Sequence, residues 1–594
     1  MTVPVDTTAG SAADRRADGL RGDRWLRGRP RPGWPLLIGL VLGLLALGPG
    51  LARGFLLDYD MVFVPRPPFS MALLGATGGP ARAVPSDAVV TVLAQVIPAD
   101  IVQKLILLAI FALACSGAAR LMGDGWRLVT GQPAPLLASV AAGVFYTWNP
   151  YVAERLLIGQ WALLLGYAGL PWVLRVLCTD RAGPDGAGIR IWPLCLAVLP
   201  AAVGGFAAMA VTAVAAVPAA LARGQGRARL WRLVTVVVVL AAASLPWAVP
   251  SLLVPVHADP AGVQVFHARA DTPFGGLGSL VMLSGIWNSS TVPAGYGGGG
   301  SASWLLVVLV AIACYLLRAR PARLAAGVGW AGIAGLAAAA AGLMPAGRTA
   351  LADLITAWPG FAILRDGQQF VGPLALTEAI GMGTGVAWLL SPSGRPDDTA
   401  DATARFLPRQ ERSGTRTGAA SARAAMPLAV IAAVAPIVLL PGMAWGLAGR
   451  LHPVQYPADW LRARQVIDGS PRPGTVLLLP WGTYRKYAWN DENVFDPWSR
   501  LLSREVIFND GLQVGRVRLA QESAAAIRMN AIVTRPGPLT ARLQSAGVSY
   551  VIIDSGPLLG SPVPGLARRA RLPGAAVLVD SRDLVLLGLP DRGS

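Results

Sequence analysis

The feature that most constrains this chain is a series of apolar runs between residues 35 and 448. Most are about 20 residues long, which lets a helix cross a lipid bilayer. They lie near 35–52, 105–122, 134–149, 160–177, 191–222, 232–254, 302–318, 323–343, 368–390 and 427–448. The stretch 191–222 is too long for one span and contains Pro200 and Gly204–Gly205, so it is predicted to form two. The sequence predicts a polytopic α-helical membrane protein with about eleven transmembrane helices.

Arginine clusters predict the orientation of these helices. The formal net charge is +18, although only 14% of the residues are charged. The clusters lie within 15–31, 223–232, 318–323 and 405–423. With eleven spans, all of them fall on the side of the N-terminus, which the positive-inside rule places in the cytoplasm. Because topology explains the charge, we expect membrane lipids and no nucleic acid as partners. The expected location is the cytoplasmic membrane, and the near absence of lysine suggests a GC-rich bacterial source.

Composition divides the chain into three predicted parts. Residues 1–33 form an arginine-rich cytoplasmic tail, 34–450 the transmembrane domain and 451–594 an extracytoplasmic α/β domain. Within the second part, 391–425 is predicted to be a disordered cytoplasmic linker. In the third part we expect strands at 475–479, 549–553, 576–579 and 584–587, and helices at 457–467, 518–531 and 538–546. That domain has no phosphate loop, nucleophile elbow or zinc signature, so binding or positioning suits it better than catalysis.

The outer loop 53–104 carries Asp58 and Asp60 just after the first span. Further along it, Ser86 is expected to cap an interfacial helix with Asp87 in its first turn. The two aspartates could be solvated loop residues. However, they stand among apolar side chains, and burial raises the pKa of a carboxylate, which suits a general base. The Asp-X-Asp spacing could also hold a divalent cation, although one such pair is a weak signal.

A second outer loop, 146–161, contains Tyr146, Trp148, Tyr151 and Trp161, which are expected to anchor the chain at the membrane interface. The same loop contains Glu154 and Arg155. These two side chains could pair with each other. Alternatively, Arg155 could bind the phosphate of a lipid, because a planar guanidinium matches phosphate oxygens. The sequence leaves both interpretations open.

Polar groups also cluster before the span at 368–390. Arg365, Asp366, Gln368 and Gln369 are either charges that mark the end of a span or part of a site. In the loop 255–301, two histidines stand ten residues apart, which is not a recognisable metal spacing. We treat them as ordinary loop residues, with His267 and Arg269 as further candidates for substrate contact. In the C-terminal domain, the run Trp481 to Asn490 could stack on sugar rings or pack against the membrane domain.

An aspartate after the first span, in a long outer loop with an interfacial helix, resembles the GT-C superfamily of membrane glycosyltransferases. The segments Tyr-Thr-Trp-Asn-Pro-Tyr-Val-Ala-Glu-Arg and Leu-Arg-Asp-Gly-Gln-Gln-Phe are similar to stretches in actinobacterial envelope arabinofuranosyl- and mannosyltransferases. The topology resemblance covers roughly residues 35–450. The chain is much shorter than the larger arabinofuranosyltransferases and lacks their extra carbohydrate-binding modules, which leaves the sugar and the acceptor open.

The resemblance implies a polyprenyl-phosphate-linked sugar as donor and an envelope glycan or glycolipid as acceptor. It also implies that Asp60, with Asp58 as the neighbouring alternative, deprotonates the acceptor hydroxyl. Arg155 and Arg365 would neutralise the leaving donor phosphate. The rival interpretations are a transporter or flippase for a lipid-linked solute and a non-enzymatic envelope scaffold. A transporter needs ionisable groups inside its spans, where Glu378 is the visible example.

Overall fold

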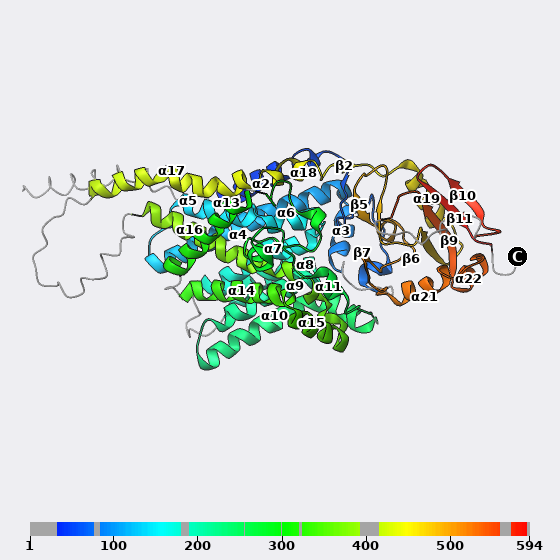
Figure 1. Ribbon diagram of the computed structural model, residues 1–594, viewed down its shortest axis with the longest axis horizontal. Helices are drawn as coiled ribbons and strands as arrows, with labels where there is room; N and C mark the ends of the chain where they lie inside the picture. The colour runs from blue at the N-terminus through cyan, green and yellow to red at the C-terminus, as the bar shows by residue number, and fades with distance from the viewer. Residues whose placement is uncertain are drawn as a thin grey trace, which may run out of the picture.

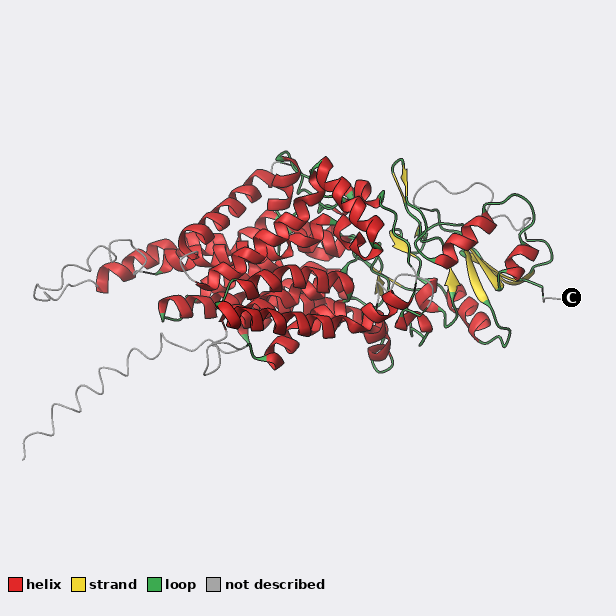
Figure 2. Cartoon of the chain, turned by 90° about the horizontal axis from the view of Figure 1, so that it is seen from below, coloured by secondary structure: helices red, strands yellow, loops and turns green. Residues whose placement is uncertain are grey.

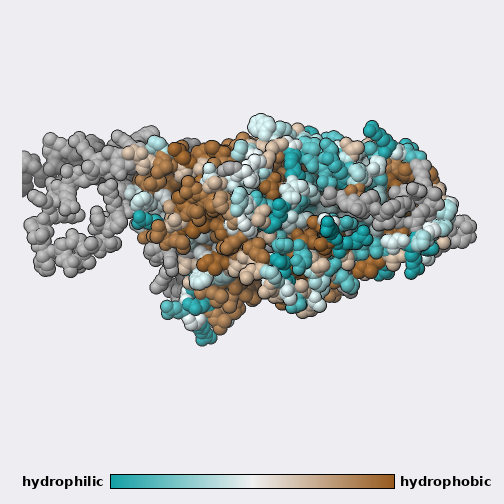
Figure 3. All heavy atoms as spheres, viewed as in Figure 1, coloured by the Kyte–Doolittle hydropathy of each residue, from teal (hydrophilic) through white to brown (hydrophobic). Residues whose placement is uncertain are grey.

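The computed structural model describes residues 33–76, 84–179, 189–254, 256–298, 300–319, 323–391, 415–558 and 572–590. A bundle of helices forms one part of the molecule, and a smaller domain that contains strands lies at one end of it (Figures 1 and 2). Apolar residues gather on the surface of the bundle, whereas hydrophilic residues prevail at the end that carries the C-terminal domain (Figure 3). This distribution is typical of a membrane-embedded bundle with a domain in water.

Each apolar run of the sequence is helical. The helices concerned are α2 (Trp34–Leu47), α4 (Ala99–Thr130), α5 (Leu136–Thr147), α7 (Trp161–Thr179), α8 (Ile191–Gly204), α9 (Phe206–Leu221), α10 (Gly226–Leu253), α13 (Gly300–Cys314), α14 (Arg323–Ala340), α16 (Gly372–Leu390) and α17 (Thr415–Leu439). Within the described residues, seven helices are long and apolar enough to cross a membrane, or eight if the pair Ala424–Leu439 and Pro441–Ala448, bent by 61°, is one span. The chain is therefore a multi-pass membrane protein, and the count of eleven spans stays a prediction.

The stretch 191–222 forms two helices, as predicted. The break lies at Gly205, whose φ of 79° suits glycine, and not at Pro200, which stays inside α8. Both helices pack on α7, and a side chain at Gly204 would collide with the backbone of Ala162. With 14 and 16 residues, α8 and α9 are shorter than a usual span.

The remaining helical elements connect the bundle helices or cover the end near the C-terminal domain. The short α-helices are α3 (Ser86–Ala94), α6 (Pro150–Leu157), α11 (Gly262–Phe266), α12 (Gly275–Val281), α15 (Pro345–Ala357) and α18 (Ala444–Ala448). The 3₁₀ turns are η2 (Gly48–Leu51), η3 (Met71–Leu74), η4 (Ser289–Thr291), η6 (Ala341–Leu343), η7 (Pro359–Arg365), η8 (Gly367–Val371) and η11 (Pro441–Met443), and Tyr315–Ala319 is a π-turn.

Helix α3 corrects one detail of the sequence analysis. Its N-cap is Pro85 and not Ser86, and no side chain caps it. Asp87 lies in the first turn, as expected, but its carboxylate also pairs with Arg500 of the C-terminal domain at 2.7 Å. Tertiary contact therefore orients the start of this helix.

Two predicted parts fall largely outside the described residues. These are the N-terminal tail, of which only Gly33 is described, and residues 392–414 of the predicted linker. Helix α17 begins at Thr415, about three turns before the predicted linker end at residue 425. The alanine-rich sequence of this stretch has high helix propensity, which explains why the helix starts early.

The C-terminal domain is built on a five-stranded mixed sheet with strand order β10-β11-β9-β3-β6. Its strands are β3 (Thr475–Leu479), β6 (Val506–Ile507), β9 (Val548–Asp554), β10 (Ala576–Asp580) and β11 (Leu584–Gly588), and its helices are α19 (Ala458–Asp468), α20 (Trp498–Leu501), α21 (Ala524–Val533) and α22 (Thr540–Ser545). Four of the five strands were predicted. In β3, Leu477 and Leu479 face the cluster that includes α21 and α22, while Val476 and Leu478 join the cluster around Trp460.

Two pairings attach this domain to the loop that follows α2. Strand β1 (Phe55–Leu56) pairs with β2 (Pro453–Val454), and the hairpin of β4 (Tyr484–Lys486) and β5 (Asn493–Phe495) reaches the turn after β1. A further pair, β7 (Gln513–Val514) and β8 (Val517–Arg518), completes the strands. The cluster around Trp460 is continuous with the apolar core of the bundle. The C-terminal domain therefore packs tightly on the segment that carries Asp58 and Asp60.

Candidate functional site

The acidic turn Asp58–Met61 follows β1 and is held on one side by the C-terminal domain. The backbone N–H of Met61 donates to the carbonyl of Asp58 at 2.9 Å, and Tyr59 at the centre of the turn has φ 43°. The N–H of Tyr59 donates to the carbonyl of Asn493 at 2.6 Å, and its own carbonyl accepts from Phe495 N–H at 2.9 Å. Strand β5 therefore supports the strained backbone of this turn.

The connection between α6 and α7 holds the acidic turn on its other side. The N–H of Asp60 donates to the carbonyl of Ile158 at 3.1 Å. Gly159 has φ 82°, and a Cβ added there would lie within 3.0 Å of backbone atoms of Asp58 and Met61. Only glycine lets the two backbones approach so closely. The turn that carries the aspartates is therefore clamped against the helix that carries Glu154 and Arg155.

Asp58 is completely buried in this turn. Its Oδ2 accepts a hydrogen bond from Arg450 at 3.2 Å, and its Oδ1 has no hydrogen-bond partner among the described residues. Burial raises the pKa of Asp58 to about 8, although the charge of Arg450 acts in the opposite direction. Burial therefore favours the protonated form of Asp58 and leaves it no exposed surface.

Asp60 is only partly buried and contacts the C-terminal domain directly. The hydroxyl of Tyr484 donates to Oδ1 of Asp60 at 2.6 Å, and the rings of Tyr484 and Tyr59 pack edge to face with centroids 5.8 Å apart. Asp60 is therefore a partly exposed carboxylate that the bundle and the C-terminal domain hold between them. Of the two aspartates, it is the one that keeps exposed surface.

Helix α6 is an interior element and not a surface loop. Asn149 caps it by accepting from Val152 N–H at 3.1 Å, and Pro150 stands in its first turn, where proline is tolerated. Of the expected interfacial anchors, Tyr146, Trp148 and Tyr151 have no exposed surface at all, and Trp161 is buried as well. The expectation that they anchor the chain at the membrane interface is wrong. They form the packed interior that positions the next residues of the helix.

Arg155 is completely buried and bound on several sides. Its guanidinium forms a bidentate pair with Asp366, with Nη1 at 2.7 Å from Oδ2 and Nη2 at 3.0 Å from Oδ1. Nη1 also donates to Gln160 and Nη2 to Gln368. The sequence analysis considered an ion pair between Arg155 and Glu154. In the structure, the ion pair of Arg155 is with Asp366. Burial acts to lower the pKa of Arg155, but its negative surroundings, Asp366 above all, outweigh burial and raise the pKa.

Glu154 lies beside this arginine and is also completely buried. Its Oε2 accepts from Gln368 Nε2 at 3.0 Å, so Gln368 bridges Glu154 and Arg155. Burial, followed by the nearby charge of Asp271, raises the pKa of Glu154 well above its ordinary value. Asp271 itself pairs with Arg269 at 3.1 Å. The predicted residues Glu154, Arg155, Asp366 and Gln368 therefore form one polar network, which adjoins Arg269.

Arg365 binds the C-terminal domain. Its Nη2 lies 3.0 Å from Oε1 of Glu522, and its guanidinium stacks over the ring of Phe266 at 4.7 Å from the centroid. His267 follows Phe266 and is partly buried against Gly342, and its Nδ1 has no hydrogen-bond partner among the described residues. Arg365 and His267 therefore flank the same short helix, α11, at the border with the C-terminal domain.

Aromatic contacts link Arg365 to the acidic turn. The ring of Phe266 packs edge to face on Trp287 with centroids 4.8 Å apart. Trp287 in turn packs on the cluster of Tyr59, Ile158 and Ile286 beside Tyr484. The structure thus brings the predicted residues into one contiguous region at one end of the bundle, in which these aromatic contacts connect Arg365 to the turn that carries Asp60.

The structure tests the possible metal site only in part. Among the described residues, no group of three or more His, Cys, Asp and Glu side chains could hold a metal ion. Asp58 is turned toward Arg450, whereas Asp60 is turned toward Tyr484. The two carboxylates of the Asp-X-Asp pair therefore bind different partners.

Sequence reasoning did not predict the partners of three candidate residues. Arg450 pairs with Asp58, Tyr484 binds Asp60 and Glu522 binds Arg365. All three lie at or beyond the end of the transmembrane domain, far from their partners in the sequence. Tyr484 belongs to the aromatic run that the sequence singled out. Asn490 of the same run donates to the carbonyl of Leu57, so part of this run packs on the loop that follows α2.

Comparisons with known proteins show which solved structures share this fold. No protein-family model and no curated protein matches the chain. The structure is similar to that of arabinofuranosyltransferase AftD from Mycobacteria, with a TM-score of 0.54 and 15% sequence identity over 96% of this chain. This chain covers 40% of AftD. The R1389S mutant of AftD, class 2, gives the same TM-score at 16% identity and 42% coverage of that chain.

This chain shares the fold of the arabinofuranosyltransferase AftD. The resemblance inferred from the sequence is therefore confirmed at the level of the fold. An oligosaccharyltransferase from Archaeoglobus fulgidus aligns over 90% of this chain and 70% of its own, at 10% identity and a TM-score of 0.39. That score is too low to indicate a shared fold. Because the chain spans less than half of AftD, the likeness describes how the bundle is built and not what it transfers.

Proposed function

We propose that this protein transfers a sugar, arabinofuranose or mannose, from a polyprenyl-phosphate donor to an envelope glycan or glycolipid. The reaction takes place at the outer face of the cytoplasmic membrane. The observation that carries this proposal is the placement of Asp60. It is a partly exposed carboxylate, clamped between a membrane bundle with a GT-C fold and the C-terminal domain. A membrane-bound donor and a water-exposed acceptor could both reach such a position.

In the proposed reaction Asp60 is the general base. The acceptor hydroxyl oxygen attacks the anomeric carbon of the donor sugar, its proton passes to the carboxylate of Asp60, and the bond between sugar and lipid phosphate breaks. The polyprenyl phosphate leaves as an anion. Tyr484, which binds Oδ1 of Asp60, holds the carboxylate in position. Asp58 is completely buried, so we assign it no contact with the substrate. Its proposed role is to support the turn that carries Asp60.

Cations near the leaving phosphate stabilise the negative charge that develops on it. We assign this role to Arg365, which binds the C-terminal domain, and to the partly exposed Arg269, with His267 as a neighbouring polar contact. Arg155 is completely buried and its Nη atoms are committed to Asp366, Gln160 and Gln368. We therefore assign Arg155 and Glu154 a positioning role.

The proposed orientation follows from the two ends of α7. The acidic turn contacts Ile158 and Gly159, just before this helix begins, whereas Arg232 binds the carbonyl of Leu177 in its last turn at 2.7 Å. Arg232 belongs to the cluster 223–232, which the positive-inside rule places in the cytoplasm. Asp60 and the C-terminal domain would then lie outside the cell, and the N-terminus inside.

The deciding experiment uses the full chain, purified in detergent, with synthetic polyprenyl-phosphate arabinofuranose and polyprenyl-phosphate mannose as donors. Asp60→Asn should lower the transfer rate by about 10²–10⁴-fold, the usual effect of losing a general base. Asp353→Asn is the matched control, because Asp353 is an exposed aspartate on α15. Full activity of Asp60→Asn would refute the assignment of the base. Transfer from neither donor by the wild type would refute the sugar assignment.

The buried carboxylate of Glu378 supports the transporter alternative. Glu378 in α16 is completely buried, and neither carboxylate oxygen has a hydrogen-bond partner among the described residues. Ionisable groups inside spans are costly and often functional. A flippase would move labelled lipid-linked sugar across sealed vesicles without forming a glycosidic bond, and Glu378→Gln would stop it. Transfer in detergent that persists in Glu378→Gln would exclude this alternative.

A further inference from the structure

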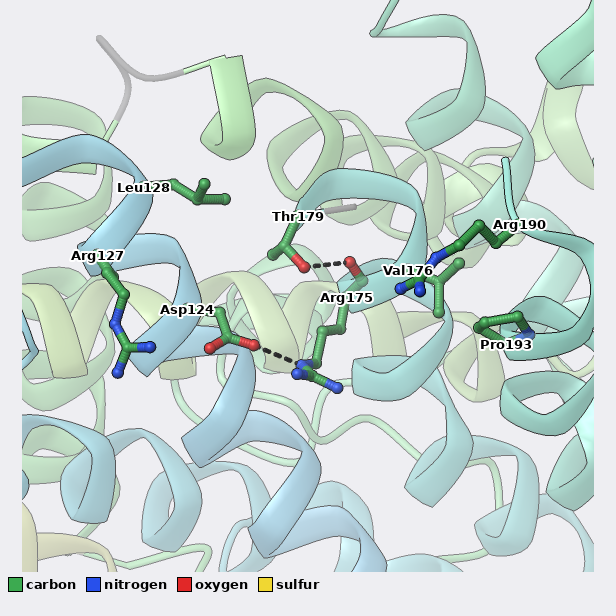
Figure 4. A pocket seen from close by; sticks show the side chains of 8 residues that line it. All are labelled: Asp124, Arg127, Leu128, Arg175, Val176, Thr179, Arg190 and Pro193. Atoms are coloured by element: carbon green, nitrogen blue, oxygen red, sulfur yellow. Dashed lines mark hydrogen bonds and ion pairs between the residues drawn. The ribbon is translucent and has the colours of Figure 1, made fainter. Parts of the chain in front are cut away.

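A second feature lies at the opposite end of the bundle from Asp60. A pocket of about 480 Å³ opens between the last turns of α4 and α7 and the first residues of α8. Its lining is formed by Asp124, Arg127, Leu128, Arg175, Val176, Thr179, Arg190 and Pro193. Figure 4 shows that the arginine side chains come from all three segments. The glycosyl transfer site uses none of these residues.

Helix α7 defines the distance between this pocket and the acidic turn. It has 19 residues, from Trp161 beside the turn to Thr179 in the pocket. At a rise of about 1.5 Å per residue it spans roughly 27 Å, close to the thickness of the hydrocarbon core of a bilayer. Arg232 binds α7 at Leu177, so the arginine cluster 223–232 lies at the same end as the pocket. The pocket therefore lies at the other membrane surface.

The pocket has an excess of positive charge. Three arginines line it against one aspartate, Asp124, which pairs with Arg175 at 2.6 Å. Both members of that pair keep about a third of their side-chain surface exposed. Arg127 and Arg190 are exposed as well. A negatively charged group that entered the pocket would meet guanidinium groups on several sides.

The surroundings of the pocket are apolar and exposed. Leu128 on α4 is 43% exposed, and Ile191 and Trp192 at the start of α8 are 57% and 79% exposed. Tryptophan at the end of a membrane helix is typical of the level of the lipid headgroups. Leu196 and Leu199 continue this exposed apolar surface along α8. Acyl chains can lie along such a surface while a headgroup sits in the pocket.

We propose that this pocket binds the phosphate headgroup of an anionic glycerophospholipid from the adjacent leaflet. Free phosphate shares the chemistry that the arginines recognise. It would gain nothing from the apolar surface of α8, which favours a lipid. Basic pockets between transmembrane helices on the cytoplasmic side bind such headgroups in other membrane proteins. The site is separate from the proposed transfer reaction and does not depend on it.

The test uses native mass spectrometry of the full chain, purified in detergent and titrated with phosphatidylglycerol, cardiolipin or phosphatidylcholine. The wild type should bind the two anionic lipids more tightly than phosphatidylcholine. Arg127→Ala and Arg190→Ala should each weaken anionic lipid binding about fivefold, and the double variant about 25-fold, if each arginine of the pocket contributes the usual share of an arginine that contacts a headgroup. Arg227→Ala is the matched control, because Arg227 is an exposed arginine of the neighbouring cluster outside the pocket.

Asp124→Asn provides a test of opposite sign. It removes the negative charge of the pocket and releases Arg175 from its ion pair, so it should strengthen binding of the anionic lipids. Inorganic phosphate distinguishes the two sources of the ligand. If a free phosphate were the ligand, millimolar phosphate would displace the lipid from the wild type. That result, equal losses in the pocket variants and Arg227→Ala, or equal binding of phosphatidylcholine would each overturn the proposal.

Discussion

The hydroxyl of Tyr484 donates a hydrogen bond of 2.6 Å to Oδ1 of Asp60, although 424 residues separate the two in the sequence. Asp60 belongs to the loop that follows α2 of the bundle, and Tyr484 belongs to strand β4 of the C-terminal domain. The pairing of Tyr59 with strand β5 places this contact, because it holds the hairpin of β4 and β5 against the turn. The C-terminal domain thus completes the surroundings of the proposed base.

Tyr484→Phe should lower the rate of sugar transfer without unfolding the protein. A hydrogen bond to a charged group contributes about 1.5–3 kcal/mol, which corresponds to roughly 10- to 100-fold in kcat if the contact holds Asp60 in its reactive position. The KM for the donor should stay within about twofold, because Tyr484 binds the base and not the donor phosphate. Steady-state kinetics with a labelled donor measure both constants.

The control for this prediction is Tyr550→Phe. The hydroxyl of Tyr550 donates to Ser470 Oγ at 2.6 Å in the same domain and does not contact the acidic turn. Equal kcat values for the two variants would show that the contact between Tyr484 and Asp60 is only structural.

Gly159→Ala should displace the acidic turn and abolish most of the activity. The new methyl group would lie within 3.0 Å of the backbone of Asp58 and Met61, which cannot move without breaking the pairing of Tyr59 with strand β5. Gly131→Ala is the control for positive φ alone. Gly131 has φ 71°, and nothing lies within 4 Å of an added Cβ there. We expect Gly159→Ala to lose activity and melting temperature, and Gly131→Ala to keep its activity. Similar behaviour of the two would contradict the clamp.

Asp58 should make the protein less stable as the pH rises. Its pKa in the folded protein is about 8, against an ordinary value of 3.8, chiefly because of burial. Between about pH 4 and about pH 8 the folded state therefore binds more protons than the unfolded state, so stability falls across this range. Asp58→Asn resembles the protonated form and should flatten the dependence of melting temperature on pH.

Asp496 and Asp554 also have pKa values raised by burial, to about 6 and about 7, so they contribute slopes of the same sign. The difference between wild type and Asp58→Asn isolates the share of Asp58. Identical slopes would show that Asp58 is ionised in the folded protein at neutral pH.

Arg155→Lys should destabilise the fold more than it impairs donor binding. Lysine cannot form the bidentate pair with Asp366 and also reach Gln368, and a disrupted buried ion pair costs about 3–5 kcal/mol. Arg175→Lys is the control, because its pair with Asp124 is partly exposed and contributes about 0–1 kcal/mol. Thermal unfolding and the donor KM should be measured together. A raised donor KM with an unchanged melting temperature would show that Arg155 binds the donor phosphate and contradict its positioning role.

The elements that could be predicted are those with local signals. Strand β3 coincides with the predicted range 475–479, because a run of apolar residues bounded by Pro473, Gly474 and Pro480 leaves little choice. The break at Gly204–Gly205 could also be predicted, because the apolar run 191–222 is too long for one span. By contrast, strands β6, β7 and β8 have only two residues each and depend on partners elsewhere in the chain.

The sequence by itself determined that the chain is a membrane bundle followed by an α/β domain, and it pointed to Asp60. Hydropathy and turn residues determine structure locally, so their effect can be predicted from the sequence alone. Only the tertiary structure decided which groups pair. It buried Asp58 beside Arg450, gave Arg155 to Asp366 instead of Glu154, and brought Tyr484 to Asp60. The physical reason is that hydrogen bonds and ion pairs act over a few ångströms in space, and chain packing alone determines which distant residues come that close.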